Sequence, residues 1–181
     1  MRLAIADPPY LGRGRRWYDK SAPATRTGRH GGGGDHHPDA AEWDRPLRHA
    51  ALIHQLDSDF DGWALACASD SLLLLASFAP TARVMVWHKT NAIPSGNRIR
   101  SAWEAVLVRV PPGRHRHGSG PKASDALTCP TIATGFVGAK PPKWTRWVLD
   151  ALGYDPEIDD VVDLFPGSGA VTAAVSAGVA L

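Results

Sequence analysis

The sequence predicts a single α/β domain, residues 1–181, built around a mostly parallel β-sheet. Short apolar runs typical of buried strands alternate with segments of helical periodicity along most of the chain. The length and the near-average apolar and charged content suit one globular domain with a substantial core. Two neighbouring strands have no helix between them, so we expect one antiparallel strand, at an edge of the sheet.

The expected strands are apolar runs that end at turn residues. They cover residues 3–5, 62–68, 82–87, 104–110 and 161–165. The first strand must end at Asp7, because Pro8 and Pro9 have no N–H group to donate to a sheet ladder. The last strand turns into a helix through a glycine-containing loop.

Four helices are expected between or after these strands. They cover residues 43–56, a segment that ends near residue 78, residues 141–153 and residues 170–180. The second helix has N-cap candidates in residues 69–71 and is stopped by Pro80. Pro141 suits the first turn of the third helix, and Gly153 suits its C-terminal cap.

Three long irregular segments, about 11–41, 88–101 and 111–133, interrupt this pattern, and loops of such length are usually functional or disordered. The formal net charge of the chain is only +2, so it is not strongly basic as a whole. Basic residues nevertheless gather in the first segment, which favours a polyanionic partner. The candidate nucleic-acid-binding residues are Arg13, Arg15, Arg16 and, after a strand, Lys89.

Several classes of protein are not expected. His30, His36 and His37 beside Asp35 match no metal-ligand spacing, so we expect no metal. No charged start precedes a long apolar stretch, and no apolar stretch is long enough to span a membrane. The two cysteines match no metal or redox motif and fit a reducing compartment, so we expect a cytoplasmic protein.

Two motifs at strand ends carry the functional prediction. Asp7-Pro8-Pro9-Tyr10 follows the first strand, and Phe165-Pro166-Gly167-Ser168-Gly169 follows Asp163 in the last strand. The ends of parallel strands meet at one edge of an open sheet, where such folds bind ligands. A glycine turn into a helix lets a ligand approach the backbone and free N–H groups, although the dinucleotide pattern G-x-G-x-x-G is not met.

These motifs, in this order, resemble those of the DNA amino-methyltransferases that use S-adenosyl-L-methionine (SAM). The similarity is to the circularly permuted branch in which D-P-P-Y precedes F-x-G-x-G. Lys140-Pro141 resembles the family's Lys-Pro segment that opens a helix before the SAM loop. Residues 87–91 and 101–104 also look similar to family strands, with less specificity, so the resemblance covers nearly the whole chain.

The resemblance implies a Rossmann-like methyltransferase domain that transfers a methyl group to the N6 amine of a flipped adenine in DNA. N4-cytosine is the alternative target, RNA stays open as a substrate, and a catalytically inactive nucleic-acid-binding or interaction protein is a further alternative. The implied catalytic residues are Asp7, Pro8, Pro9 and Tyr10. The implied SAM-binding residues are Asp7, Lys140, Asp163, Phe165, Pro166, Gly167, Ser168 and Gly169.

Two departures from the family pattern shape the expected partners. The chain ends one helix after the SAM loop, so we expect the family's later strands, with their ribose-binding acid, to be missing. SAM binding would then be weak, be completed by a second copy or a partner subunit, or be lost. Residues 111–133 are too short for a separate target-recognition domain. Such compact enzymes look similar to those of phages and mobile elements, which suggests a bacterial or phage-infected cell.

Overall fold

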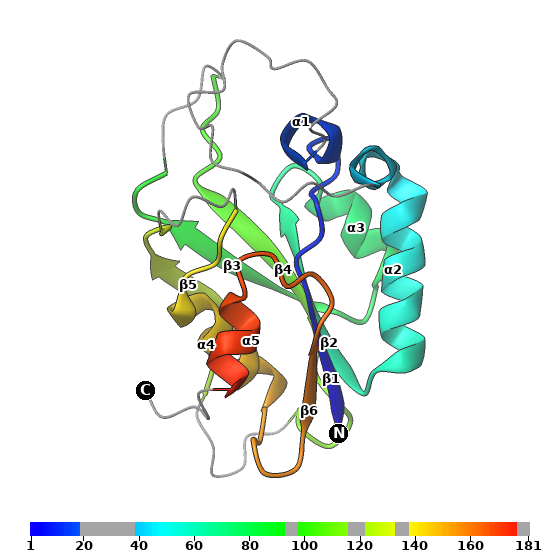
Figure 1. Ribbon diagram of the computed structural model, residues 1–181, viewed down its shortest axis with the longest axis vertical. Helices are drawn as coiled ribbons and strands as arrows, with labels where there is room; N and C mark the ends of the chain where they lie inside the picture. The colour runs from blue at the N-terminus through cyan, green and yellow to red at the C-terminus, as the bar shows by residue number, and fades with distance from the viewer. Residues whose placement is uncertain (19–38, 93–97, 116–121, 133–137, 177–181) are drawn as a thin grey trace.

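Six strands form one sheet with the order β5-β3-β4-β2-β1-β6 (Figure 1). The computed structural model describes residues 1–18, 39–92, 98–115, 122–132 and 138–176. The strands are β1 (Arg2–Ala6), β2 (Gly62–Ala68), β3 (Arg83–Lys89), β4 (Trp103–Arg109), β5 (Ala126–Cys129) and β6 (Asp160–Asp163). The helices are α1 (Gly14–Tyr18), η1 (Ala40–Asp44), α2 (Pro46–Asp59), α3 (Leu72–Phe78), α4 (Pro142–Leu152) and α5 (Ala170–Ser176).

The sheet is mostly parallel, as the sequence predicts, and β4 is its antiparallel strand. β1 pairs in parallel with β2 and β6, and β3 pairs in parallel with β5. β4 runs antiparallel to both of its neighbours, β2 and β3. The expectation that the antiparallel strand lies at an edge is wrong, because β4 lies between β3 and β2 inside the sheet. Its continuous apolar run fits this buried place.

Alternate residues of the strands fill two cores, one on each face of the sheet. α4 and α5 cover one face, where Ile5, Val106 and Trp144 are buried together. η1, α2 and α3 cover the other face, where Ala6, Leu107 and Trp43 are buried. In Figure 1, α2 and α3 lie on the side of the sheet opposite α4 and α5. This two-sided cover is the α/β architecture that the strand and helix pattern predicts.

Two short elements, α1 and β5, lie in segments that the sequence predicts to be irregular, 11–41 and 111–133. The short helix η1 covers the last two residues of the expected loop 11–41 and the start of the helix expected over 43–56. β5 extends the sheet beyond β3, and Trp87 Nε1 donates a hydrogen bond to the Cys129 carbonyl at 3.1 Å. Its four residues alternate between exposed and buried, so no continuous apolar run marks this strand. Residues 19–38 of the first segment, with its histidines, lie outside the described residues.

Asp159 holds together the edge of the sheet at which β1 and β6 begin. Its buried carboxylate accepts hydrogen bonds from the N-terminal ammonium of Met1 at 2.9 Å, from Arg114 Nη2 at 2.9 Å and from the Asp155 amide at 2.8 Å. Arg114 also donates to the Gly153 carbonyl at the end of α4. Burial opposes ionisation of Asp159, but these donors outweigh it and lower its pKa to about 2.

We predict that Asp159→Asn lowers the free energy of unfolding by about 2 kcal/mol at pH 7, because the ionised group is stabilised by the fold. A carboxyl group with a depressed pKa stabilises only above its unfolded pKa. The deficit should therefore shrink as the pH falls from about 4 toward 2. Urea unfolding across this pH range measures it. Asp160→Asn, on the exposed neighbouring position, is the matched control and should change stability by less than about 0.5 kcal/mol.

Candidate active site

The candidate site lies at the edge of the sheet where β1, β2, β3, β5 and β6 end, which we call the carboxyl edge. Because β4 runs in the opposite direction, it begins at this edge. The sequence-predicted Asp7 follows β1, and the sequence-predicted Asp163 ends β6. Lys89 ends β3, and Glu104 is the second residue of β4. Chain segments far apart in sequence therefore bring charged groups to one edge of the sheet.

The motif Asp7-Pro8-Pro9-Tyr10 leaves the sheet at this edge. Pro8 and Pro9 are buried, whereas Asp7 and Tyr10 are partly exposed. Lys140 Nζ donates to Asp7 Oδ2 at 2.7 Å and to Tyr10 Oη at 3.1 Å. It donates a third hydrogen bond to the Gly138 carbonyl at 3.1 Å, so partners are available for all three protons of the buried ammonium. The structure thus brings together Asp7, Tyr10 and Lys140, three residues that the sequence assigns to the site.

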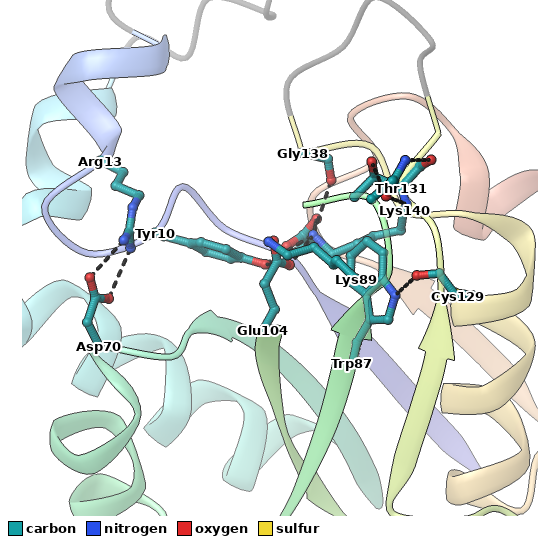
Figure 2. Close-up of polar contacts among 12 residues, drawn as sticks. Tyr10, Arg13, Asp70, Trp87, Lys89, Glu104, Cys129, Thr131, Gly138 and Lys140 are labelled. Atoms are coloured by element: carbon teal, nitrogen blue, oxygen red, sulfur yellow. Dashed lines mark hydrogen bonds and ion pairs between the residues drawn. The ribbon is translucent and has the colours of Figure 1, made fainter. Parts of the chain in front are cut away.

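Glu104 adds a second carboxylate, which sequence reasoning placed on a strand without a role in the site. Tyr10 Oη donates to Glu104 Oε2 at 2.6 Å, and Lys89 Nζ donates to Oε1 at 3.0 Å. Lys140 Nζ lies 3.5 Å from Oε2. Figure 2 shows the Tyr10 side chain extending from the loop after β1 toward Glu104 and Lys140. Two carboxylates and two ammonium groups therefore meet around one phenol.

The electrostatics of this cluster follow from burial and charge pairing. Burial raises the pKa of Asp7, and the charge of Lys140 opposes this effect. Burial also opposes the ionisation of Glu104, but Lys140 and Lys89 outweigh it and lower the Glu104 pKa. The pKa of Tyr10 is raised well above its ordinary value by burial and by the two carboxylates, so its hydroxyl keeps its proton. Lys140 stays an ammonium, because Asp7 and Glu104 raise its pKa against the effect of burial.

The glycine loop lies beside the Asp7 motif because their strands are neighbours. β1 and β6 pair in parallel, and Asp163 lies opposite Ile5. Ile5 is two residues before Asp7 in the chain. Gly167 and Gly169 have φ angles of +43° and +75°, which residues with a Cβ rarely adopt. A Cβ on Gly169 would meet no heavy atom within 4 Å, and one on Gly167 would meet only the Phe165 carbonyl oxygen at 3.7 Å. The loop therefore presents bare backbone to open space.

Asp163 organises the start of this loop. Its carboxylate accepts a hydrogen bond from the Phe165 amide at 3.2 Å, and Thr172 Oγ1 lies 3.5 Å from the other oxygen. Burial raises the pKa of Asp163, and the nearby charge of Asp7 contributes. The Phe165 ring packs edge-on against Trp43, with 5.1 Å between centroids, so its side chain belongs to the core beneath α2. Phe165 stays partly exposed at the start of the loop.

Pro166 and the residues after it complete the predicted cofactor loop. Pro166, Gly167 and Ser168 are exposed, and Gly169 is partly exposed. The Asp163 carboxylate and the backbone from Pro166 to Gly169 thus follow one another at the end of β6, the strand next to the one that precedes the Asp7 motif. An acidic side chain beside a glycine turn suits a ligand with a positive charge and hydrogen-bond donors.

The basic residues predicted to bind nucleic acid take two different positions. Arg13 forms a bidentate ion pair with Asp70, with Nη–O distances of 3.1 and 2.7 Å, and Lys89 is paired with Glu104 (Figure 2). Arg15 and Arg16 are exposed on α1, and the Arg16 guanidinium lies over the Trp17 ring. Arg15 and Arg16 are therefore available to a polyanion, whereas Arg13 and Lys89 are engaged within the protein.

α1 is fixed in place by contacts that the sequence did not predict. Asp44 accepts hydrogen bonds from the Gly14 and Arg15 amides at 2.8 and 3.1 Å. A Cβ on Gly14 would lie 2.1 Å from the Ala40 carbonyl oxygen, so only glycine allows α1 to pack this closely on η1. At the other end of α1, the Tyr18 hydroxyl would lie 3.5 Å from a Cβ on Gly138, the residue whose carbonyl accepts from Lys140. Tyr18 is a second aromatic residue beside the candidate site.

Two exclusions concern only the part of the chain that the structure describes. Within it, no group of three or more His, Cys, Asp or Glu side chains could hold a metal ion. None of its helices is long and apolar enough to cross a membrane.

Comparison with solved structures supports the fold. The chain resembles the crystal structure of M1.HpyAVI in complex with SAM, with a TM-score of 0.52 and 13% identity, over 97% of this chain and 77% of that one. It resembles the structure of M1.HpyAVI alone with a TM-score of 0.53 and 16% identity, over 97% of this chain and 75% of that one. No family model and no curated protein sequence matches the chain. At this identity, the similarity establishes a shared fold.

We predict that Lys140→Met lowers the free energy of unfolding by about 3 kcal/mol at pH 7.5, because it leaves Asp7 and Glu104 without their shared buried cation. The deficit should shrink as the pH falls toward 5, since burial raises the pKa of Asp7 and, without the Lys140 ammonium to oppose this effect, its carboxyl takes up a proton. In wild type, Lys140 stays charged throughout this range. Chemical denaturation at several pH values measures both effects.

Lys143→Met, at an exposed position in the first turn of α4 and three residues after Lys140, is the matched control for the loss of a lysine. It should leave the stability within about 0.5 kcal/mol of wild type. A Lys140→Met deficit that is absent, or that does not change with pH, would contradict the charge pairing described for the cluster.

Proposed function

We propose that this chain is a SAM-dependent methyltransferase that methylates the exocyclic N6 amine of an adenine in DNA. The proposal rests on one observation above all. β1 and β6 are parallel neighbours with Ile5 opposite Asp163, so the Asp7-Pro8-Pro9-Tyr10 motif and the glycine loop leave the sheet side by side. An acceptor group for a substrate and a bare-backbone loop for a cofactor are thereby adjacent. The fold similarity to M1.HpyAVI, whose structure includes SAM, agrees with this assignment.

The residues beside β6 fit SAM by their chemistry. SAM carries a positive sulfonium, an amino group and a ribose, and it supplies a methyl group on a leaving group of its own. Asp163 and Asp7 offer carboxylates to positive or hydrogen-bond-donating groups. The exposed backbone from Pro166 to Gly169, with the open space beside Gly169, leaves room for a ligand to lie against the chain. We assign SAM binding to Asp7, Lys140, Asp163 and residues 165–169.

Asp7 and Pro8 are assigned to the target amine. The nitrogen lone pair of an adenine amine is delocalised into the ring, so the nitrogen is a poor nucleophile. A carboxylate oxygen of Asp7 and the carbonyl of Pro8 accept its two hydrogens, which favours a tetrahedral nitrogen and directs its lone pair toward the methyl group. Positive charge develops on that nitrogen as the N–C bond forms, and the two acceptors stabilise it.

Lys140 fixes Asp7 for this role. It engages Oδ2 of Asp7 at 2.7 Å, and we assign the second oxygen, Oδ1, to the amine. After transfer the amine must lose one proton, and the Asp7 carboxylate is the acceptor that the assigned geometry puts closest to it. Burial raises the pKa of Asp7, which makes it a better proton acceptor than an exposed carboxylate.

Tyr10 and α1 are assigned to the nucleic acid. The base leaves its stack to reach Asp7, and the Tyr10 ring provides a surface on which it stacks. Arg15 and Arg16, exposed on α1, contact the phosphate backbone. α1 lies beyond the end of β1, on the side of the sheet where the Asp7 motif emerges (Figure 1).

A methyl-transfer assay tests the proposal directly. Purified protein is incubated with radiolabelled SAM and unmethylated DNA of mixed sequence, and the digested nucleosides are identified by mass spectrometry. N6-methyladenine is the expected product. N4-methylcytosine would overturn the choice of base, and methylation of an RNA substrate in place of DNA would overturn the choice of nucleic acid. No SAM binding at millimolar concentration in calorimetry would overturn the enzyme assignment for this chain.

We predict that Asp7→Ala lowers kcat about 10²–10³-fold, because it removes the acceptor on which the amine is aligned and stabilised. The rate of methyl transfer to unmethylated DNA measures this loss. Thermal unfolding followed by circular dichroism shows whether the variant is folded. Asp160→Ala, exposed at the start of β6, should transfer methyl groups at the wild-type rate. A folded Asp7→Ala protein that keeps more than about a third of wild-type activity would refute the role of Asp7.

A further inference from the structure

β4 is reversed relative to the other strands, and this reversal delivers Glu104 to the site. The five other strands end at the carboxyl edge, so residues after them reach the site from loops. β4 begins there, and Glu104 lies in the sheet itself, opposite Ala68 of β2 and Trp87 of β3. A side chain on a central strand is held more rigidly than one on a loop. Glu104 is therefore a fixed point against which loop residues can be oriented.

The orientation of the Tyr10 ring depends on such a rigidly held partner. Its ring extends from the loop after β1 toward Glu104 and Lys140 (Figure 2). At the backbone, the Tyr10 carbonyl accepts from the Arg13 amide at 2.8 Å, and Arg13 is held by Asp70. At the far end, the phenol donates to Glu104 Oε2 at 2.6 Å and accepts from Lys140. The two anchors leave the ring little freedom to rotate or tilt.

Glu104 acts here as a hydrogen-bond acceptor. Its pKa is lowered by Lys140 and Lys89 against the effect of burial, so it is a carboxylate at neutral pH and has no proton to give. One oxygen serves Tyr10, and Lys89 engages the other at 3.0 Å. The Glu104 side chain is 14% exposed, and each of its carboxylate oxygens has a hydrogen-bond partner. Hydrogen bonds from a phenol to an ionised acceptor are short and strong, and this one is 2.6 Å long.

We propose that Glu104, with Lys89 as its counter-ion, is a positioning residue that holds the Tyr10 ring in the orientation on which the target base stacks. This inference rests on the proposed function and adds to the site two residues that neither sequence motif contains. Lys89 then acts inside the protein, by neutralising Glu104, and its role as a direct nucleic-acid contact is replaced. Lys140 links the same phenol to Asp7, so the stacking ring and the amine acceptor share one hydrogen-bonded frame.

The first test separates positioning from general stability by enzyme kinetics. Glu104→Gln and Tyr10→Phe should each lower kcat/KM for DNA about tenfold, as loss of one charge-assisted hydrogen bond implies, with KM for SAM within twofold of wild type. Because both substitutions act on the hydrogen bond between Tyr10 and Glu104, adding Glu104→Gln to Tyr10→Phe should lower kcat/KM for DNA little further. Glu157→Gln, an exposed glutamate outside the site, is the matched control and should behave as wild type.

The second test does not depend on activity. The chain has three tyrosines, Tyr10, Tyr18 and Tyr154, so tyrosine labelled with ¹³C at Cζ gives a small set of signals that single Tyr→Phe variants assign. Glu104 raises the pKa of Tyr10 by its charge and its hydrogen bond. In Glu104→Gln the Tyr10 signal should shift and titrate at a lower pH than in wild type, while Tyr154 stays unchanged.

The outcomes distinguish the inference from the proposed function. If wild type transfers no methyl group, the proposed function fails, and the Tyr10 signal still reports whether Glu104 holds the phenol. If wild type is active and Tyr10→Phe keeps full activity, the positioning role is overturned even where Glu104→Gln does not fold. A Glu104→Gln loss that is equally large in wild-type and Tyr10→Phe backgrounds would also overturn it, because Glu104 would then act without Tyr10.

Discussion

The ion pair between Lys140 and Asp7 joins parts of the chain that are more than a hundred residues apart, and the site is arranged around it. A buried ammonium needs compensating charge and hydrogen-bond acceptors, and Asp7, Tyr10 and the Gly138 carbonyl provide them. In return the charge of Lys140 opposes the rise in the Asp7 pKa that burial causes. The loop after β1 and the segment before α4 therefore depend on each other for their positions.

The features that the sequence predicted depend on local chemistry. The two prolines after Asp7 force the chain out of the sheet whatever lies around them, and a glycine turn between a strand and a helix is visible in the sequence itself. These signals predict that Asp7 and the loop 165–169 lie at one edge of the sheet. α4 was likewise predicted from its periodicity, Pro141 and Gly153, and the structure has Gly153 in the left-handed conformation expected of a helix C-cap.

The features that the sequence did not predict depend on contacts between distant segments. Glu104 reaches the site because β4 runs antiparallel between β3 and β2, and its own run of residues cannot reveal that position. Lys89 was a candidate nucleic-acid contact because it follows a strand, and its pairing with Glu104 depends on the neighbouring β4. β5 owes its strand conformation to pairing with β3, since its four residues carry no continuous apolar pattern.

The pairing of β1 with β6 has a consequence for the synthesis of the protein. β1 is synthesised before its partner β6, which follows only after nearly all the other described elements have been made. Contacts of such large sequence separation form slowly, because the intervening chain must be ordered first. Until then one side of β1 has no neighbour in the sheet. A nascent chain thus carries the Asp7 motif well before it can add the glycine-loop half of the proposed site.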